Sequence, residues 1–278
     1  MNLTELNIHL HTRALSIKKR FLEMYAKANA GHIGSSLSAA EIITFLLFDW
    51  MAEDDEIILS KGHAAALMYS ALAEKGYLAE EDIATFYKDN TYLAAHPPAN
   101  KIKKIPFATG SLGHGLSLAA GFGLSRSLKK QNDLIFCVTS DGELNEGSIW
   151  EAAMFIAHHK LKNVVWLIDK NNLQGFGTTS EVMNLDPLAD KLTAFGFETL
   201  EVDGHDFTAL RNIKENFVNR LRPLAVIANT VKGRYWATNE NTIHSHYLPF
   251  KEGEFDTIIQ QLELHYQNSV DQLKKAQL

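Results

Sequence analysis

Two apolar runs that end in polar turns constrain this chain more than any other feature. Residues 134–139 lead into Asp141-Gly142, and residues 164–168 lead into Asn171-Asn172. About 30 residues separate the two turns, which is the size of one strand–helix–strand crossover. Parallel strands joined in this way end at the same edge of a sheet, and open α/β sheets bind ligands at that edge. We therefore expect Asp141 and Asn171 to lie side by side in a ligand site.

The residue types at this edge favour a hard cation that holds a diphosphate. Carboxylate and amide oxygens suit Mg²⁺, and the backbone carbonyl of Leu173 would join the same metal. The turn at Gly142 would let backbone N–H groups approach a phosphate. Each residue alone also has an ordinary interpretation, because Asp often precedes a helix and Asn-Asn is common in turns. The pairing of both on neighbouring strands favours the metal site.

Strand and helix patterns alternate along the rest of the chain. Strands are expected at residues 56–59, 134–139, 164–168, 197–202 and 224–231, and helices at 5–29, 38–47, 63–75, 113–130, from 148, 186–195, 206–220 and 253–275. The pairs Ser38/Glu41 and Ser148/Glu151 match capping boxes, which predicts helix starts at both serines. Residues 88–112 form a long irregular loop, of a kind that is usually functional or poorly ordered.

This alternation predicts an α/β fold with a mostly parallel sheet and helices on both faces. The chain has no repeat and no linker-like segment, so we expect a single domain over residues 1–278 that ends in the helix at 253–275.

Composition excludes several classes of protein. The chain has 278 residues, of which 46% are hydrophobic, enough for a large core. A net charge of -6 without a basic run argues against a nucleic-acid partner. No run approaches the roughly 18 apolar residues of a membrane span, so we expect no membrane segment. Cys137 is the single cysteine and no leader pattern is visible, which favours a cytoplasmic protein.

The histidines are the other candidates for chemistry. Four of them, His32, His63, His96 and His114, adjoin Gly or Pro in expected loops, and His244 and His246 share another loop. An exposed loop histidine is the ordinary interpretation of any one of these. A zinc site is the rival, although the chain has no His-Glu-x-x-His helix and no cysteine pair. Just past Asp141, Glu146 would interact favourably with the positive end of the helix dipole, and Glu151 would serve as the capping partner of Ser148.

At this point the chain resembles the thiamine-diphosphate enzymes. Asp141-Gly142 to Asn171-Asn172 is similar to their Gly-Asp-Gly…Asn-Asn fingerprint, with Ser140 in place of the first Gly. Further motifs resemble transketolases: Gly31-His32-x-Gly34, Ser60-Lys61-Gly62-His63, Ala95-His96-Pro97, Gly110-Ser111-Leu112-Gly113-His114-Gly115 and Gly142-Glu143-Leu144-Asn145-Glu146-Gly147. Together they cover most of residues 15–250. The resemblance implies the fold of the diphosphate-binding domain.

The resemblance also implies roles for individual residues. The metal ligands would be Asp141, Asn171 and the carbonyl of Leu173. The cofactor-binding residues would be His63, Gly110, Leu112, Gly142, Glu143, Asn171 and His246. The catalytic histidines would be His32, His63, His96 and His246, with pKa values near neutrality for proton transfer. Glu146 and Glu151 would lie at a subunit interface. His244 competes with His246 for its match, and Tyr247 replaces the Gly that usually follows.

Length sets this chain apart from a complete transketolase, which is more than twice as long. The chain therefore resembles the N-terminal subunit of a split transketolase, and His114 supports the split form. The resemblance implies thiamine diphosphate, Mg²⁺ (or Ca²⁺ or Mn²⁺), and sugar or sugar-phosphate substrates. It also implies a partner with the pyrimidine-binding and C-terminal domains, in a heterotetramer. Two alternatives stay open: a related ketol or acyl transferase acting on a modified or sulfonated sugar, and a non-catalytic cofactor-binding scaffold subunit.

Overall fold

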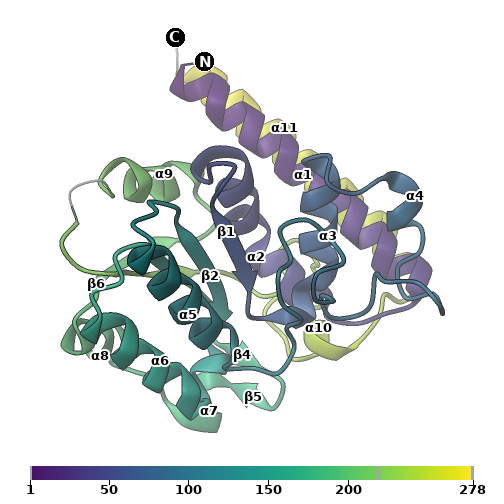
Figure 1. Cartoon of the computed structure of the whole chain (residues 1–278). Coiled ribbons are helices and arrows are strands. Elements are labelled where there is room, and N and C mark those ends of the chain that lie inside the picture. The colour runs from purple at the N-terminus through teal and green to yellow at the C-terminus, as the bar shows by residue number, and fades with distance from the viewer. Residues whose placement is uncertain (1, 218–219, 277–278) are drawn as a thin grey trace.

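A computed structural model describes residues 2–217 and 220–276 (Figure 1). Within these residues five strands form one parallel sheet in the order β1-β2-β3-β7-β6. The strands are β1 (Glu56–Leu59), β2 (Ile135–Ser140), β3 (Val164–Lys170), β6 (Glu198–Asp203) and β7 (Leu224–Asn229). The two residues after Asn171-Asn172 begin a small hairpin of β4 (Leu173–Gln174) and β5 (Gly177–Thr178).

Helices cover both faces of the sheet. One face is covered by α1 (Leu3–Ala28), α2 (Ile33–Phe45), α3 (Ala65–Glu74), α9 (Phe207–Glu215) and α11 (Glu254–Lys275). The other face is covered by α5 (Gly115–Leu128), α6 (Gly147–His158) and α8 (Leu188–Phe195). Shorter elements are α4 (Glu80–Ile83), α7 (Thr179–Met183), α10 (His244–Tyr247), the π-helix η1 (Leu46–Trp50) and the 3₁₀ turns η2 (Gly62–Ala64) and η3 (Gly142–Asn145). The predicted α/β fold is confirmed.

Alternation along each strand explains why β2, in the interior of the sheet, is apolar over most of its length. Phe136 and Val138 of β2 pack into the core on the α1–α3 side, whereas Ile135 and Cys137 pack against α5 and α6. Successive side chains of a strand point to opposite faces, so a sheet covered on both faces needs apolar residues at every position. All six residues of β2 are accordingly buried.

Both capping-box predictions were wrong. Helix α2 begins at Ile33, so Ser38 and Glu41 lie inside it, and both are buried. Glu41 contacts Lys18 and His205 rather than a helix end. Helix α6 begins at Gly147, and the Ser148 hydroxyl donates to the carbonyl of Gly113. A spacing of three residues also places side chains on one helix face, where tertiary contacts can use them.

The expectation that no segment is long and apolar enough to span a membrane was also wrong. The 18 residues Ile33–Trp50, which form α2 and η1, reach that length with a mean hydropathy of 1.3. In the structure 89% of this segment is buried. It packs into the core between the sheet and the other helices of its face, which accounts for its apolar character.

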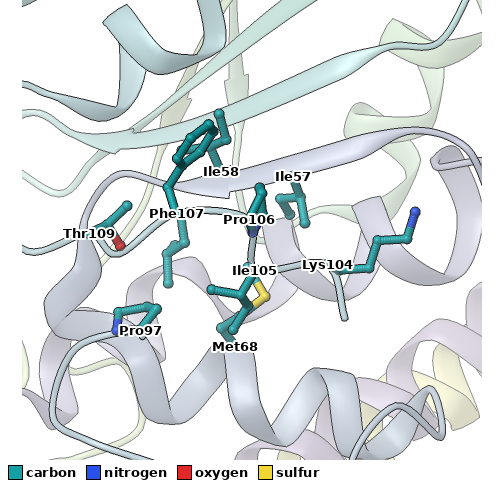
Figure 2. Close-up of a pocket in the computed structure, with 10 residues that line it drawn as sticks. Ile57, Ile58, Met68, Pro97, Lys104, Ile105, Pro106, Phe107 and Thr109 are labelled. Atoms are coloured by element: carbon teal, nitrogen blue, oxygen red, sulfur yellow. The ribbon is translucent and has the colours of Figure 1, made fainter. Parts of the chain in front are cut away.

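Residues 88–112 follow an irregular path that is held by packing against β1 and α3. Figure 2 shows Pro106 and Phe107 beside Ile57 and Ile58 of β1, with Met68 below them. The cleft between these side chains is apolar, which makes it a packing gap rather than a site for chemistry. The loop continues past it to the carboxyl edge of the sheet.

Candidate active site

A cavity of about 310 Å³ opens at the carboxyl edge of the sheet. The strand register brings the ends together, because Leu59 pairs with Val138, Ser140 with Asp169, and Lys170 with Asn229. The predicted site residues that line the cavity are His32, His63, His96, Gly110, Leu112, Gly142, Glu146, Asn171, Leu173 and His246. Segments far apart in sequence therefore converge at the edge where the motif pattern placed the ligand.

Asp141 and Asn171 lie at the ends of β2 and β3, as the pattern predicted. Asp141 is only 1% exposed, and its carboxylate accepts hydrogen bonds from the N–H groups of Gly142 (2.8 Å) and Asn172 (2.5 Å). The amide oxygen of Asn171 accepts from the N–H of Leu173 at 3.1 Å. Burial, and then the charge of Asp169, raises the pKa of Asp141 to about 6. The Asp141 carboxylate is therefore bonded by neutral backbone donors in a place where its charge is poorly solvated.

These groups fit a divalent cation. A carboxylate oxygen, an amide oxygen and the backbone carbonyl of Leu173 are the hard oxygen ligands that Mg²⁺ and Ca²⁺ take. A cation beside Asp141 would also favour the ionised form that burial disfavours. The donor set and its electrostatics thus agree with a metal at this end of the cavity.

Beneath the cavity lies a buried ion pair that the sequence analysis missed. Lys61 and Asp169 are both fully buried and form a salt bridge. Ser38 donates to the Asp169 carboxylate at 2.5 Å, and Thr230 donates to its other oxygen. Burial alone would raise the pKa of Asp169, but the Lys61 ammonium and these hydrogen bonds hold it below its usual value. The signal in the sequence was a lysine directly after a strand, within the Ser-Lys-Gly-His motif.

Lys232 is a second cationic residue that the sequence analysis missed. Its ammonium donates to the Leu173 carbonyl at 3.0 Å and lies 2.8 Å from Nδ1 of His246. Burial, and then the nearby Lys61 charge, lowers the pKa of Lys232 to about 8. Lys232 follows β7 as Asp141 follows β2, so the same strand-end argument would have found it. An ammonium at this end of the cavity suits an anionic group such as a diphosphate.

Four imidazoles from four separate segments of the chain meet in the cavity, next to Lys232. The ring centroid of His32 lies 5.6 Å from that of His63, 6.3 Å from His96 and 5.3 Å from His246. His246 lines the cavity, whereas His244 is exposed and does not. The structure therefore places His246, and not its competitor His244, in the cluster.

The surroundings of these histidines favour the neutral imidazole, because they lower each pKa. Burial, followed by the charges of His96 and Lys232, lowers the pKa of His32 to about 4. Burial and Lys232 lower the pKa of His246 to about 3, and burial also lowers the pKa values of His63 and His96. These directions differ from the expected values near neutrality, because the cluster is enclosed and adjoins ammonium groups. A neutral imidazole can donate from one nitrogen and accept at the other.

Three predicted residues lie outside the cavity lining. Asp141 is just behind it, and Glu143 is fully buried with its carboxylate turned toward other loops of the chain. That carboxylate accepts from the N–H groups of Gly113 (2.9 Å) and Ser140 (3.1 Å) and from the Ser60 hydroxyl. Glu143 thus joins three loops of the site. Glu151 is exposed on α6, and its interface role stays a prediction.

Gly110 shows how closely the loops approach. Its φ of +141° lies in a region that favours glycine, and an added Cβ would come within 2.7 Å of the His96 ring. The loop 88–112 therefore brings His96 and Gly110 into contact at the cavity, which ties the packing shown in Figure 2 to the site.

The fold and this site together define a thiamine-diphosphate-binding domain. The chain matches the family model described as the thiamine diphosphate binding domain of transketolase over residues 11–272. The chain therefore belongs to the transketolase family.

Two curated relatives match along most of their own length. The chain is 34% identical over 271 residues to the 6-deoxy-6-sulfo-D-fructose transketolase subunit SqwG of Clostridium sp. (strain MSTE9), covering 94% of this chain and 98% of that protein. It is 35% identical over 264 residues to an apulose-4-phosphate transketolase subunit of Actinobacillus succinogenes, covering 91% of this chain and 96% of that protein.

The solved structures include longer transketolases. Transketolase from Campylobacter jejuni superposes with a TM-score of 0.86 at 29% identity, covering 95% of this chain and 43% of that one. The chain thus spans less than half of that solved structure and nearly all of the two curated subunits.

Proposed function

We propose that this chain is the N-terminal subunit of a split transketolase that depends on thiamine diphosphate and Mg²⁺. With a partner subunit it would transfer a two-carbon ketol unit from a ketose donor to an aldose acceptor. The observation that carries this proposal is the convergence, in one cavity, of the Asn171 and Leu173 oxygens, the Lys232 ammonium and four imidazoles, with the Asp141 carboxylate directly behind. Family membership gives the cofactor, and the geometry gives the residues that would hold it.

Each end of the cavity has its own task. Asp141, Asn171 and the Leu173 carbonyl would hold Mg²⁺, with Ca²⁺ or Mn²⁺ as substitutes. Lys232, His63, His246 and the N–H groups near Gly142 would bind the diphosphate. Thiamine diphosphate, when bound, supplies the carbanion chemistry, while the protein supplies position and electrostatics. His32 and His96 would form hydrogen bonds with the sugar hydroxyls and would transfer protons to and from the sugar.

The names of two relatives support a partner subunit. Two relatives of nearly the same extent are named as subunits, whereas the solved transketolase continues well beyond the matched region. The partner would carry the pyrimidine-binding and C-terminal domains, in a cytoplasmic heterotetramer. Glu146 is exposed at the cavity rim and Glu151 is exposed on α6, which leaves both carboxylates free to meet it.

The test is reconstitution of activity. The chain is purified alone and also co-purified with its partner, and ketol transfer from a set of ketose donors is measured with Mg²⁺ and with EDTA. We expect turnover only in the complex with both thiamine diphosphate and Mg²⁺. Full turnover by the isolated chain would contradict the partner requirement. A complex that holds the cofactor but transfers nothing from any donor would instead favour the scaffold alternative.

One observation favours a second substrate class. The relative covered to 98% of its length is named for a sulfonated ketose, and another is named for apulose 4-phosphate. A transketolase of modified or sulfonated sugars is therefore the second candidate. Comparing kcat/KM for a sulfonated ketose, a phosphorylated ketose and an unmodified ketose in the same complex distinguishes the two.

A further inference from the structure

One side chain at the cavity mouth joins two segments that are otherwise separate. Tyr247, the last residue of α10, donates its phenol O–H to the carbonyl of Gly175 at 2.9 Å. Gly175 and Phe176 form the turn between β4 and β5. The phenol therefore connects the segment that carries His246 to the tip of the hairpin that begins at Leu173.

The two ends of this connection differ in how firmly they are held. The α10 end is anchored, because the His32 N–H donates to the His246 carbonyl at 3.0 Å and Gly34 packs against Ser245. The hairpin consists of only two residue pairs, and an isolated two-stranded hairpin is at best marginally stable in water. Besides Tyr247, the Gln174 amide N–H holds the hairpin by donating to the Asn145 side chain at 3.0 Å, and Lys232 holds its base by donating to the Leu173 carbonyl at 3.0 Å. Tyr247 therefore steadies the hairpin from an anchored base.

Gly175 fits this contact because it has no side chain. A Cβ at this position would overlap the phenol oxygen of Tyr247, well inside van der Waals contact. The φ of Gly175 lies outside the left-handed region, so the backbone itself would accept alanine. What excludes a side chain at position 175 is thus the phenol and not the backbone conformation.

We propose that Tyr247 is a positioning residue that latches the β4–β5 hairpin over the cofactor end of the cavity, with Gly175 as its matched partner. The hairpin begins at Leu173, whose carbonyl accepts from Lys232 and is the third oxygen of the metal set. Fixing the tip fixes this carbonyl and keeps the mouth beside His246 narrow, which slows release of the bound cofactor. This consequence for the cofactor rests on the proposed function, whereas the latch itself does not.

The latch is tested first without any ligand, in the full chain. Tyr247→Phe keeps the ring and removes the O–H, and we expect amide hydrogen exchange at residues 173–178 to quicken by about threefold to tenfold, as for one net hydrogen bond. The unfolding equilibrium constant of the whole chain should rise by no more than the same factor, because the ring remains. Tyr87→Phe is the control, since Tyr87 is similarly exposed but lines a different cavity. Unchanged exchange in Tyr247→Phe would overturn the latch.

The pairing is tested by a double-mutant cycle in the complex with its partner, loaded with thiamine diphosphate and Mg²⁺. Gly175→Ala should raise the cofactor dissociation rate by about threefold to tenfold, because the phenol is pushed out of its hydrogen bond. In a Tyr247→Gly background the same substitution should add nothing, since the clash is gone. Gly121→Ala, a helical glycine with no atom within 4 Å of the added Cβ, is the control.

The outcomes separate this proposal from the function itself. An equal effect of Gly175→Ala in both backgrounds would overturn the pairing. Dissociation at the wild-type rate in both Tyr247→Phe and Gly175→Ala would overturn the role in cofactor retention. Failure of the wild-type complex to hold thiamine diphosphate would instead count against the proposed function, and hydrogen exchange would still decide the latch.

Discussion

Two aspartates at the ends of neighbouring strands have opposite environments. Asp169 lies in β3 beneath the cavity and Asp141 follows β2 behind its wall, and the Asp141 N–H donates to the Asp169 carbonyl at 3.1 Å. Asp169 is paired with Lys61, which helps to hold its pKa low. Among the described residues, the Asp141 carboxylate accepts hydrogen bonds only from backbone N–H groups, and burial raises its pKa to about 6.

The difference shows how a buried carboxylate can be assigned a role. Burying a charge is costly unless a partner compensates for it. The compensation for Asp169 comes from this chain, so its role is to hold the strands and loops together. The compensation for Asp141 is incomplete, and a strongly perturbed carboxylate beside a cavity is a candidate for binding from outside. If the two aspartates differ in this way, substitutions around Asp169 should mainly lower stability, and substitutions at Asp141 should mainly lower cofactor binding.

The largest effect is expected under Asp169. Lys61→Met leaves the Asp169 carboxylate buried without its cation, and breaking a buried pair in this way costs about 3–5 kcal/mol of unfolding free energy. Urea unfolding of the chain measures it. Lys103→Met removes the exposed pair with Glu53 and should give no measurable change. Equal stability of both variants would remove the distinction between the two aspartates.

The next effect is expected at Asp141, and in binding rather than stability. Asp141→Ala removes the charged ligand of the proposed cation, so affinity for thiamine diphosphate in the presence of Mg²⁺ should fall by roughly 100-fold or more. Stability should fall less than in Lys61→Met, by about 1–3 kcal/mol at most, because the Gly142 and Asn172 N–H groups lose their acceptor. Calorimetric titration of the complex and urea unfolding of the chain measure the two quantities.

A control for this variant is available on the same sheet. Asp203→Ala removes a carboxylate at the carboxyl end of β6, which accepts from the His205 N–H at 2.8 Å and does not line the cavity. Its cofactor affinity should match that of the wild type. Wild-type affinity in Asp141→Ala itself would refute the metal assignment.

A smaller effect separates the histidine side of the cavity from the metal end. His96→Ala should lower kcat/KM for the ketose donor by roughly tenfold to 100-fold, because one imidazole is lost while its neighbours remain. Affinity for thiamine diphosphate should change little, since the Asp141 end is intact. Steady-state kinetics and cofactor titration on the same complex give both values. Equal losses in both would show that His96 has been misassigned.

The smallest expected effect is a pH dependence that belongs to His32. The pKa of His32 is lowered from 6.5 to about 4, so the unfolded chain binds this proton first. Its contribution to stability is therefore complete above pH 6.5 and is lost as pH falls through about 4. His32→Asn should make the unfolding free energy fall less steeply with pH over this window. The folded and unfolded chains would then differ by up to about one fewer bound proton. Urea unfolding at pH 7.5, 6 and 5 measures the slope, and an unchanged slope contradicts the assignment.

Much of the fold follows from local pattern. The strand expected at residues 56–59 coincides with β1, and those at 134–139 and 164–168 differ from β2 and β3 by one or two residues at their ends. Continuous apolar runs bounded by turn residues are strong local signals. Because parallel strands end together, the same pattern also places Asp141 and Asn171 at one edge.

The polar residues beneath the cavity could not be found in this way. Lys61 and Lys232 belong to a residue type that is almost never fully buried unless it is paired, and their partners come from distant segments of the chain. Ser38 and Glu41 matched a capping box because that pattern spans only four residues, whereas their actual partners lie 131 and 164 residues away. Such contacts become visible only when the strand order and register are known.

The wide spacing of the cavity residues has a consequence for how the protein is made. The lining begins at His32 and is completed by His246 and Tyr247. Chains emerge from the ribosome starting at the N-terminus, so the helices and early strands can form long before α10 exists. A nascent chain therefore has no complete coenzyme site until translation has passed residue 247, so coenzyme capture follows synthesis of α10.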